Sequence, residues 1–118
     1  MPSSKHDLVK LPNGERADIG DKLETYSLNV LHREGRHKAR VFASALGITL
    51  VNAEVLRRAV RKAAAESDDA QSRGDNGFGR VFILKFPLET EMGAATILTA
   101  WIIRRDEDFP RLTTCYIL

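Results

Sequence analysis

The chain has 118 residues, of which 43% are hydrophobic and 29% are charged, which predicts a globular domain and excludes a disordered or fibrous protein. Its one cysteine, Cys115, excludes an internal disulfide framework and a cysteine-based zinc cage, and we expect it to face the core. The net charge is only +2, but residues 31–63 carry eight Lys or Arg and two Asp or Glu, a local charge of +6. Such a block either attracts a polyanion or simply solvates the outer faces of helices.

The first half of the chain predicts helices. Residues 1–7 show no periodicity and are expected to form a flexible tail, followed by a single domain over 8–118. Short extended pieces flank a turn at Pro12-Asn13-Gly14. The spacing of apolar residues then predicts three helices, over 21–28, 36–46 and 52–65.

The second half predicts strands. Residues 66–79 are rich in Asp, Ser and Gly and are typical of a flexible loop. Alternating patterns follow and predict three strands, over 81–86, 94–104 and 112–118, with Pro87 ending the first or placing it at an edge. The order of elements indicates an α+β fold, with N-terminal helices packed on one face of a three- to four-stranded antiparallel sheet.

No phosphate-binding glycine loop, dinucleotide fingerprint or metalloprotease motif occurs in the chain. His32 and His37 are too far apart around a helix to share a metal and have no third ligand near them, so we expect no metal and no cofactor. No apolar run is typical of a secretory signal or long enough to cross a membrane, and the expected compartment is the cytosol.

Two segments contain candidate functional residues. Lys38 lies at the edge of the apolar stripe of its helix, where it either serves a site or packs its stem and extends its ammonium into solvent. On the last hairpin, Thr99 and Trp101 share one side of their strand, and Thr114 and Tyr116 share one side of theirs. If these side chains lie on an open sheet face, they form a platform that stacks a base and holds a phosphate; otherwise they only reflect strand propensity.

Two motifs resemble a small bacterial family of unassigned function. Lys22-Leu23-Glu24-Thr25-Tyr26-Ser27-Leu28-Asn29, followed by His32, Gly35 and Lys38-Ala39-Arg40-Val41-Phe42, resembles the pattern K-L-x-x-Y-L-L-N-P-x-H-P-x-G-x-x-K-A-x-x-F. Thr99-Ala100-Trp101-Ile102-Ile103 and Pro110-Arg111-Leu112-Thr113-Thr114-Cys115-Tyr116 resemble T-V-W-I-I and P-R-L-V-T-A-Y. The chain departs from the first pattern at Ser27, Val30 and Arg33, which stand where the pattern has Leu, Pro and Pro.

That family is similar to the barnase–EndoU–colicin–RelE group of nucleases, in which helices precede an antiparallel sheet. The resemblance implies a metal-independent endoribonuclease, as in the toxins of bacterial toxin–antitoxin or conflict systems. The catalytic candidates that it implies are His32, Lys38, Arg111 and Thr114.

In this hypothesis His32 is a general base or acid, Lys38 and Arg111 neutralise charge on the phosphorane, and Thr114 binds a phosphate oxygen. The remaining candidates would bind the RNA backbone or stack its bases: Arg36, Arg40, Arg57, Arg58, Arg61, Thr99, Trp101 and Tyr116.

The expected partners are RNA and a cognate antitoxin or immunity protein, with no membrane. The alternative is a non-catalytic binding module of the same fold that presents its basic helices to a protein or a nucleic acid. An antitoxin is a weaker hypothesis, because neutralisers of RNA-binding toxins are commonly acidic and this chain has a pI near 8.9.

Overall fold

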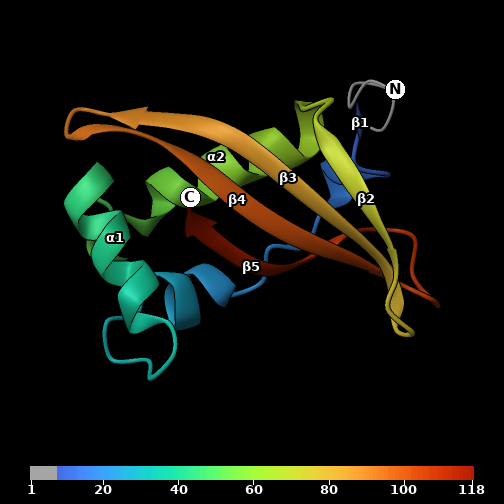
Figure 1. Ribbon diagram of the computed structural model, residues 1–118, viewed down its shortest axis with the longest axis horizontal. Coiled ribbons are helices and arrows are strands. Elements are labelled where there is room, and N and C mark those ends of the chain that lie inside the picture. Colours follow the sequence, from blue (N-terminus) through green and yellow to red (C-terminus); the bar gives the residue numbers. More distant parts are fainter. Residues whose placement is uncertain (1–7) are drawn as a thin grey trace.

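A computed structural model describes residues 8–118 and shows an α+β fold built on a five-stranded antiparallel sheet (Figure 1). The strands follow one another in chain order across the sheet, so each pairs with the next along the chain. They are β1 (Leu8–Val9), β2 (Ala70–Asp75), β3 (Gly79–Thr90), β4 (Gly93–Arg104) and β5 (Arg111–Ile117). The predicted tail over 1–7 lies outside the described residues.

Two α-helices and three shorter helical turns precede most of the sheet. They are η2 (Gly14–Arg16), η3 (Leu23–Ser27), α1 (Arg36–Leu46), η4 (Leu50–Asn52) and α2 (Ala53–Glu66); a further turn follows Asp21 at the start of η3. In Figure 1, α2 runs along one face of the sheet behind β3 and β4, while α1 lies at one end of the molecule. Both α1 and η3 contact β5, so these two elements meet at the β5 edge of the sheet.

The helices form where the apolar spacing predicts them. In α1, Ala39, Phe42 and Leu46 are buried on one stripe, and the helix ends at Gly47, whose φ of 68° is left-handed. In α2 the buried stripe comprises Ala53, Leu56, Val60, Ala63 and Ala64. Phe42, Leu46 and the stripe of α2 belong to the same core cluster as the inner faces of the strands.

The sheet is larger than predicted. Residues 70–75, expected to lie in a flexible loop, form β2, because their backbone pairs with β3 from Ala70↔Leu84 onward. Leu8 and Val9 add β1 to the outer side of β2. The polar sequence of this segment predicted a loop because most side chains of β2 are exposed and show no apolar alternation. The strand forms through backbone hydrogen bonds, which the side-chain pattern does not report.

Pro87 does not end its strand, and β3 continues to Thr90. The pairing of β2 with β3 stops at Leu84, so Pro87 lies in a part of β3 that has only β4 beside it. Proline is tolerated there because an edge position does not need its missing N–H.

The predicted open platform on the last hairpin is wrong for two of its residues. Thr99 and Trp101 are both 0% exposed and belong to the core face that the helices cover. The Trp101 indole Nε1 donates to the Thr99 hydroxyl at 2.8 Å, and that hydroxyl donates to the Leu84 carbonyl at 2.8 Å. Their polar groups are therefore satisfied inside the protein, and neither side chain is open to a base.

No single helix in residues 8–118 has the length and apolar character to cross a membrane; Arg36–Leu46 and Leu50–Glu66 meet that test only jointly, across a 68° bend.

Candidate functional site

A polar pocket of about 300 Å³ lies where η3 and the loop before α1 meet β5. Its lining is Lys22, Thr25, Tyr26, His32, Thr113 and Thr114, and we call it the tyrosine pocket. The lining contains a lysine, an imidazole and four hydroxyl groups, and no carboxylate. Such a set of groups suits an anion such as a phosphate.

Lys38 reaches the rim of the tyrosine pocket from α1. Its Nζ donates a hydrogen bond to the Tyr26 hydroxyl at 2.9 Å. The ammonium also lies 5.0 Å from the ring centre of Tyr26 and 5.5 Å from that of Tyr116. Both rings stabilise the cation through their π faces, so a half-buried Lys38 is held in one place rather than extended into solvent.

His32 lies in the same pocket, but its ring is already engaged. Its Nδ1 accepts hydrogen bonds from the backbone N–H groups of Glu34 and Gly35, each at 3.0 Å. In the neutral imidazole the proton is therefore on Nε2, which makes His32 a hydrogen-bond donor at its free nitrogen. This geometry supports a role in shaping the loop before α1 and gives less support to the predicted general base.

The loop that carries His32 packs closely on η3. A Cβ at Gly35 would lie 2.1 Å from the Tyr26 carbonyl oxygen, so only glycine allows this approach. The His32 and Tyr26 rings meet edge to face, with their centres 5.0 Å apart. Gly35 thus sets the distance between the two pocket residues.

η3 is itself fixed to β5. The buried Ser27 hydroxyl donates to the Cys115 carbonyl at 2.7 Å. Ser27 is one of the three departures from the quoted pattern, which has Leu at that position.

A β-bulge brings both threonines of β5 to the pocket. Ala100 pairs with Thr114 and Trp101 with Leu112, so Thr113 is the extra residue between them. Consecutive strand residues normally point to opposite faces, and the bulge is what allows Thr113 and Thr114 to line one pocket. The Thr113 hydroxyl donates to the Ala100 carbonyl at 3.1 Å, while no hydrogen bond engages the Thr114 hydroxyl in the described structure.

Arg111 does not join the other three catalytic candidates. It lies in a neighbouring pocket of about 240 Å³, where it forms ion pairs with Glu107 at 2.7 Å and with Asp18 at 2.9 Å. The Glu107 carboxylate raises the pKa of the Arg111 guanidinium, and Arg111 in turn lowers the pKa of Glu107. The two carboxylates offset the charge of this guanidinium and reduce what it can offer to a phosphorane.

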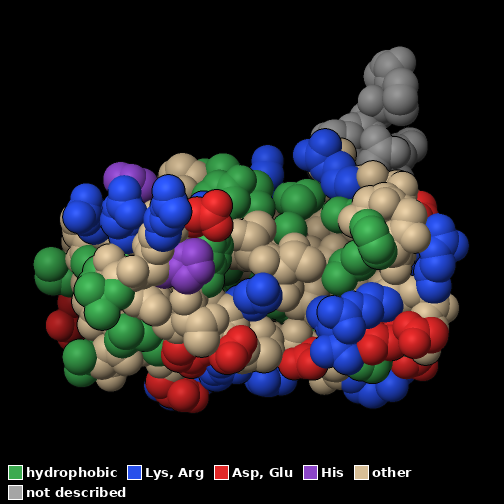
Figure 2. Space-filling model, turned by 90° about the horizontal axis from the view of Figure 1, so that it is seen from below, with side chains coloured by type: hydrophobic (Ala, Val, Ile, Leu, Met, Phe, Trp, Pro, Cys, Tyr) green, Lys and Arg blue, Asp and Glu red, His purple; other side chains and the backbone are tan. Residues whose placement is uncertain are grey.

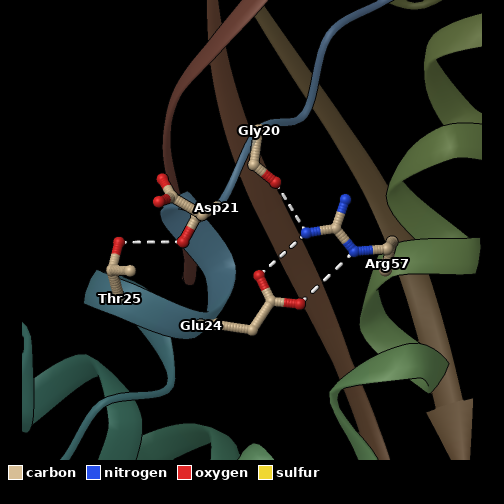
Figure 3. Close-up of polar contacts among 5 residues, drawn as sticks. All are labelled: Gly20, Asp21, Glu24, Thr25 and Arg57. Atoms are coloured by element: carbon tan, nitrogen blue, oxygen red, sulfur yellow. Dashed lines mark hydrogen bonds and ion pairs between the residues drawn. The ribbon is translucent and has the colours of Figure 1, made fainter.

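Arg57, predicted to attract RNA, forms contacts within the protein that join α2 to η3. Figure 3 shows its guanidinium between the carboxylate of Glu24 on η3 and the carbonyl of Gly20, at 2.8 and 2.6 Å. In the same view the Thr25 hydroxyl donates to the Asp21 carbonyl. Arg58 and Arg61 are exposed on α2, which contributes no residue to the tyrosine pocket.

Arg36 and Arg40 lie on the face of α1 opposite to Lys38, because residues two apart on a helix differ by about 200°. Figure 2 shows both described histidines beside a group of Lys and Arg side chains at the α1 end of the molecule. At the other end, Lys and Arg alternate with Asp and Glu. Neither Arg36 nor Arg40 lines the tyrosine pocket.

Four residues line the tyrosine pocket that the sequence did not predict as site residues: Lys22, Thr25, Tyr26 and Thr113. Lys22 and Tyr26 occupy the K and Y of the quoted pattern, so the motif already held a signal for them. The sequence held no signal for Thr113, because its place in the pocket comes from a bulge, and a bulge depends on how two strands pair.

Cys115 is fully buried, as predicted, and burial raises the pKa of its thiol to about 12. A thiol in this environment is not a nucleophile near neutral pH. Among residues 8–118 no group of three or more His, Cys, Asp and Glu side chains could hold a metal ion.

The fold and the pocket define an α+β domain with a cationic, carboxylate-free pocket at the edge of its sheet. The chain belongs to the DUF6883 family, a domain of unknown function, whose family model matches residues 10–118. No curated protein and no solved structure matches the chain.

Proposed function

We propose that the protein is a metal-independent endoribonuclease whose active site is the tyrosine pocket together with Lys38. The observation that carries the proposal is the 2.9 Å hydrogen bond from Lys38 to the Tyr26 hydroxyl, at the rim of a pocket that also contains His32 and Thr114. A half-buried ammonium that donates a hydrogen bond to a phenol stabilises the phenolate, and this assists transfer of the phenol proton. The nuclease resemblance of the two motifs adds a second, independent support.

In the proposed reaction the 2′-oxygen of a ribose attacks the adjacent phosphorus, and its proton passes to solvent. Lys22 and Lys38 neutralise the charge that builds on the phosphoryl oxygens, while Thr114 and the His32 Nε2–H donate hydrogen bonds to them. The bond to the 5′-oxygen breaks, and Tyr26 gives that oxygen its proton. Lys38 stabilises the resulting phenolate until water reprotonates it. The products are a 2′,3′-cyclic phosphate and a 5′-hydroxyl.

The test is cleavage of total RNA and tRNA by the purified protein in EDTA, beside Tyr26→Phe. The variant keeps the ring that packs on His32 and Lys38 but lacks the proton donor, so we expect the rate to fall by about 100-fold or more. Lys62→Ala, which removes an exposed lysine of α2 outside the pocket, is the matched control and should cleave like the parent.

Cleavage in EDTA by the parent, with cyclic phosphate ends and loss in Tyr26→Phe, supports the proposal. A folded parent that cuts no RNA, or a Tyr26→Phe variant that cuts at the parental rate, contradicts it. We also propose the toxin role that the resemblance implies: expression of the parent should arrest host growth, and expression of Tyr26→Phe should not.

The second candidate is a non-catalytic binding module. The observation that favours it is the double hydrogen bond to His32 Nδ1, which gives this histidine a structural role. RNA binding by the parent that survives in Tyr26→Phe, with no cleavage by either protein, would favour the binding module.

A further inference from the structure

The tyrosine pocket is one end of a longer depression. It shares Lys22 and Thr113 with the pocket that contains Arg111. That pocket in turn shares Ile102, Arg104 and Thr113 with a third pocket of about 590 Å³. We call the three adjoining pockets the Thr113 groove, since Thr113 lines each of them.

The far end of the Thr113 groove holds an exposed aromatic ring. Phe78 is 76% exposed, in the turn between β2 and β3, and it lines the third pocket together with Arg104 and Arg105. Figure 1 shows this turn and the β4–β5 connection at the same end of the molecule. A large apolar side chain in water is unfavourable, which makes its exposure informative.

The turn that carries Phe78 is held in place. The Phe78 N–H donates to the Asn76 side chain at 2.9 Å, and Gly77 has a left-handed φ of 95°. From the β4–β5 connection, the Arg105 guanidinium donates to the Gly77 carbonyl at 3.1 Å and pairs with Asp75 at 3.2 Å. The ring is thus presented by a fixed backbone, which lowers the entropy cost of binding a partner to it.

Two guanidinium groups and one carboxylate line the third pocket beside Phe78, from Arg104, Arg105 and Asp106. Arg104 is exposed and forms no ion pair within residues 8–118, while Arg105 is tied to Asp75. An exposed ring next to an available guanidinium is the arrangement that stacks an unpaired base and contacts its phosphate. A duplex would hide its bases from such a ring, whereas a single strand offers them.

We infer that Phe78 and Arg104 form a nucleotide-binding subsite, and that the substrate is single-stranded RNA lying along the Thr113 groove from this subsite to the tyrosine pocket. The inference rests on the proposed function for the position of the cleaved phosphate. The subsite itself is recognised by base stacking and does not depend on cleavage.

The test measures equilibrium binding of short, labelled 2′-O-methyl RNA strands, which lack the 2′-hydroxyl and are not cut. One strand carries bases, a second has the same backbone without bases, and a third is the base-paired duplex. Phe78→Ala should weaken binding of the base-bearing strand on the order of tenfold and leave the abasic strand unchanged. Phe78→Trp should restore the affinity. Met92→Ala, an exposed apolar side chain at the other hairpin, should change neither.

Three results overturn the inference: no binding of any single strand by the parent, equal parental affinity for base-bearing and abasic strands, or a Phe78→Ala loss common to both. The last result would point to a protein-docking turn or a local structural effect. The two proposals fail separately. Base-dependent binding through Phe78 without cleavage contradicts only the ribonuclease, and Tyr26-dependent cleavage that is insensitive to Phe78→Ala contradicts only the subsite.

Discussion

Lys38 shows how a lysine is held near a sheet. Packing its stem against the apolar stripe leaves an ammonium that needs partners once it leaves bulk water. The Tyr26 hydroxyl and the two tyrosine rings supply them, at 2.9, 5.0 and 5.5 Å. No carboxylate pairs with this ammonium in the described structure, so its charge is available to an anion in the tyrosine pocket.

Ser27 follows Tyr26 in η3 and helps to position it. Its fully buried hydroxyl makes the bond that fixes η3 to β5. Ser27→Ala leaves the Cys115 carbonyl without that donor, and we expect the free energy of unfolding to fall by about 1–3 kcal/mol. Chemical denaturation measures it, and Ser44→Ala, at an exposed position of α1, is the control that should lose no stability. Equal stability of Ser27→Ala and the parent would show that the bond contributes little.

At the scale of elements, β5 is held to its surroundings by ion pairs as well as by β4. Arg111 joins β5 to the Glu107 loop and to Asp18, whose backbone also pairs with β5. A third ion pair, from Arg16 to Asp108, joins the same loop to η2. These contacts give Arg111 a structural role.

The Arg111–Glu107 pair predicts a pH dependence. Because Arg111 lowers the pKa of Glu107 below its ordinary 4.5, the folded state favours the carboxylate, and the stabilisation is complete above 4.5 and lost as the pH falls through the lowered pKa. In Glu107→Gln we expect lower stability at neutral pH and a shallower acid dependence, so that its curve approaches the parental one at low pH. Denaturation across a pH series measures this. Glu89→Gln is the control on an exposed carboxylate, and parallel curves for Glu107→Gln and the parent would contradict the prediction.

At the scale of the whole molecule, cations are distributed unevenly around the Thr113 groove. Lys22 and Arg104 line it, while Arg58 and Arg61 lie on α2, which lines none of its three pockets. Net charge therefore says less about the proposed RNA binding than the position of each cation does.

The salt dependence of the proposed RNA binding tests whether the cations of the groove contact RNA. Each lost phosphate contact lowers the slope of log affinity against log salt by about 0.7 for a single strand. We expect that decrease in Lys22→Ala and in Arg104→Ala, and an unchanged slope in Arg58→Ala. A decrease in Arg58→Ala of the same size would restore the predicted role of the outer face of α2 and move the RNA path off the groove.

The sequence by itself determined the α+β fold, the helices at α1 and α2, the long strands and the buried Cys115, because apolar spacing is a local property of the chain. It also pointed to His32, Lys38 and Thr114, which converge at one pocket. The same pattern had no information on β2, whose pairing comes from the backbone, or on the face that Thr99 and Trp101 take.

Only the tertiary structure decided which groups meet. Arg111 and Arg57, both predicted to contact RNA, form ion pairs within the protein. Their carboxylate partners come from distant parts of the chain or from a loop that folds back, so the sequence did not predict these pairs. A bulge in β5 added Thr113, and the close approach at Gly35 brought Tyr26 to His32. Spacing along the chain sets which face a residue takes, but contacts between separate elements set what it can bind.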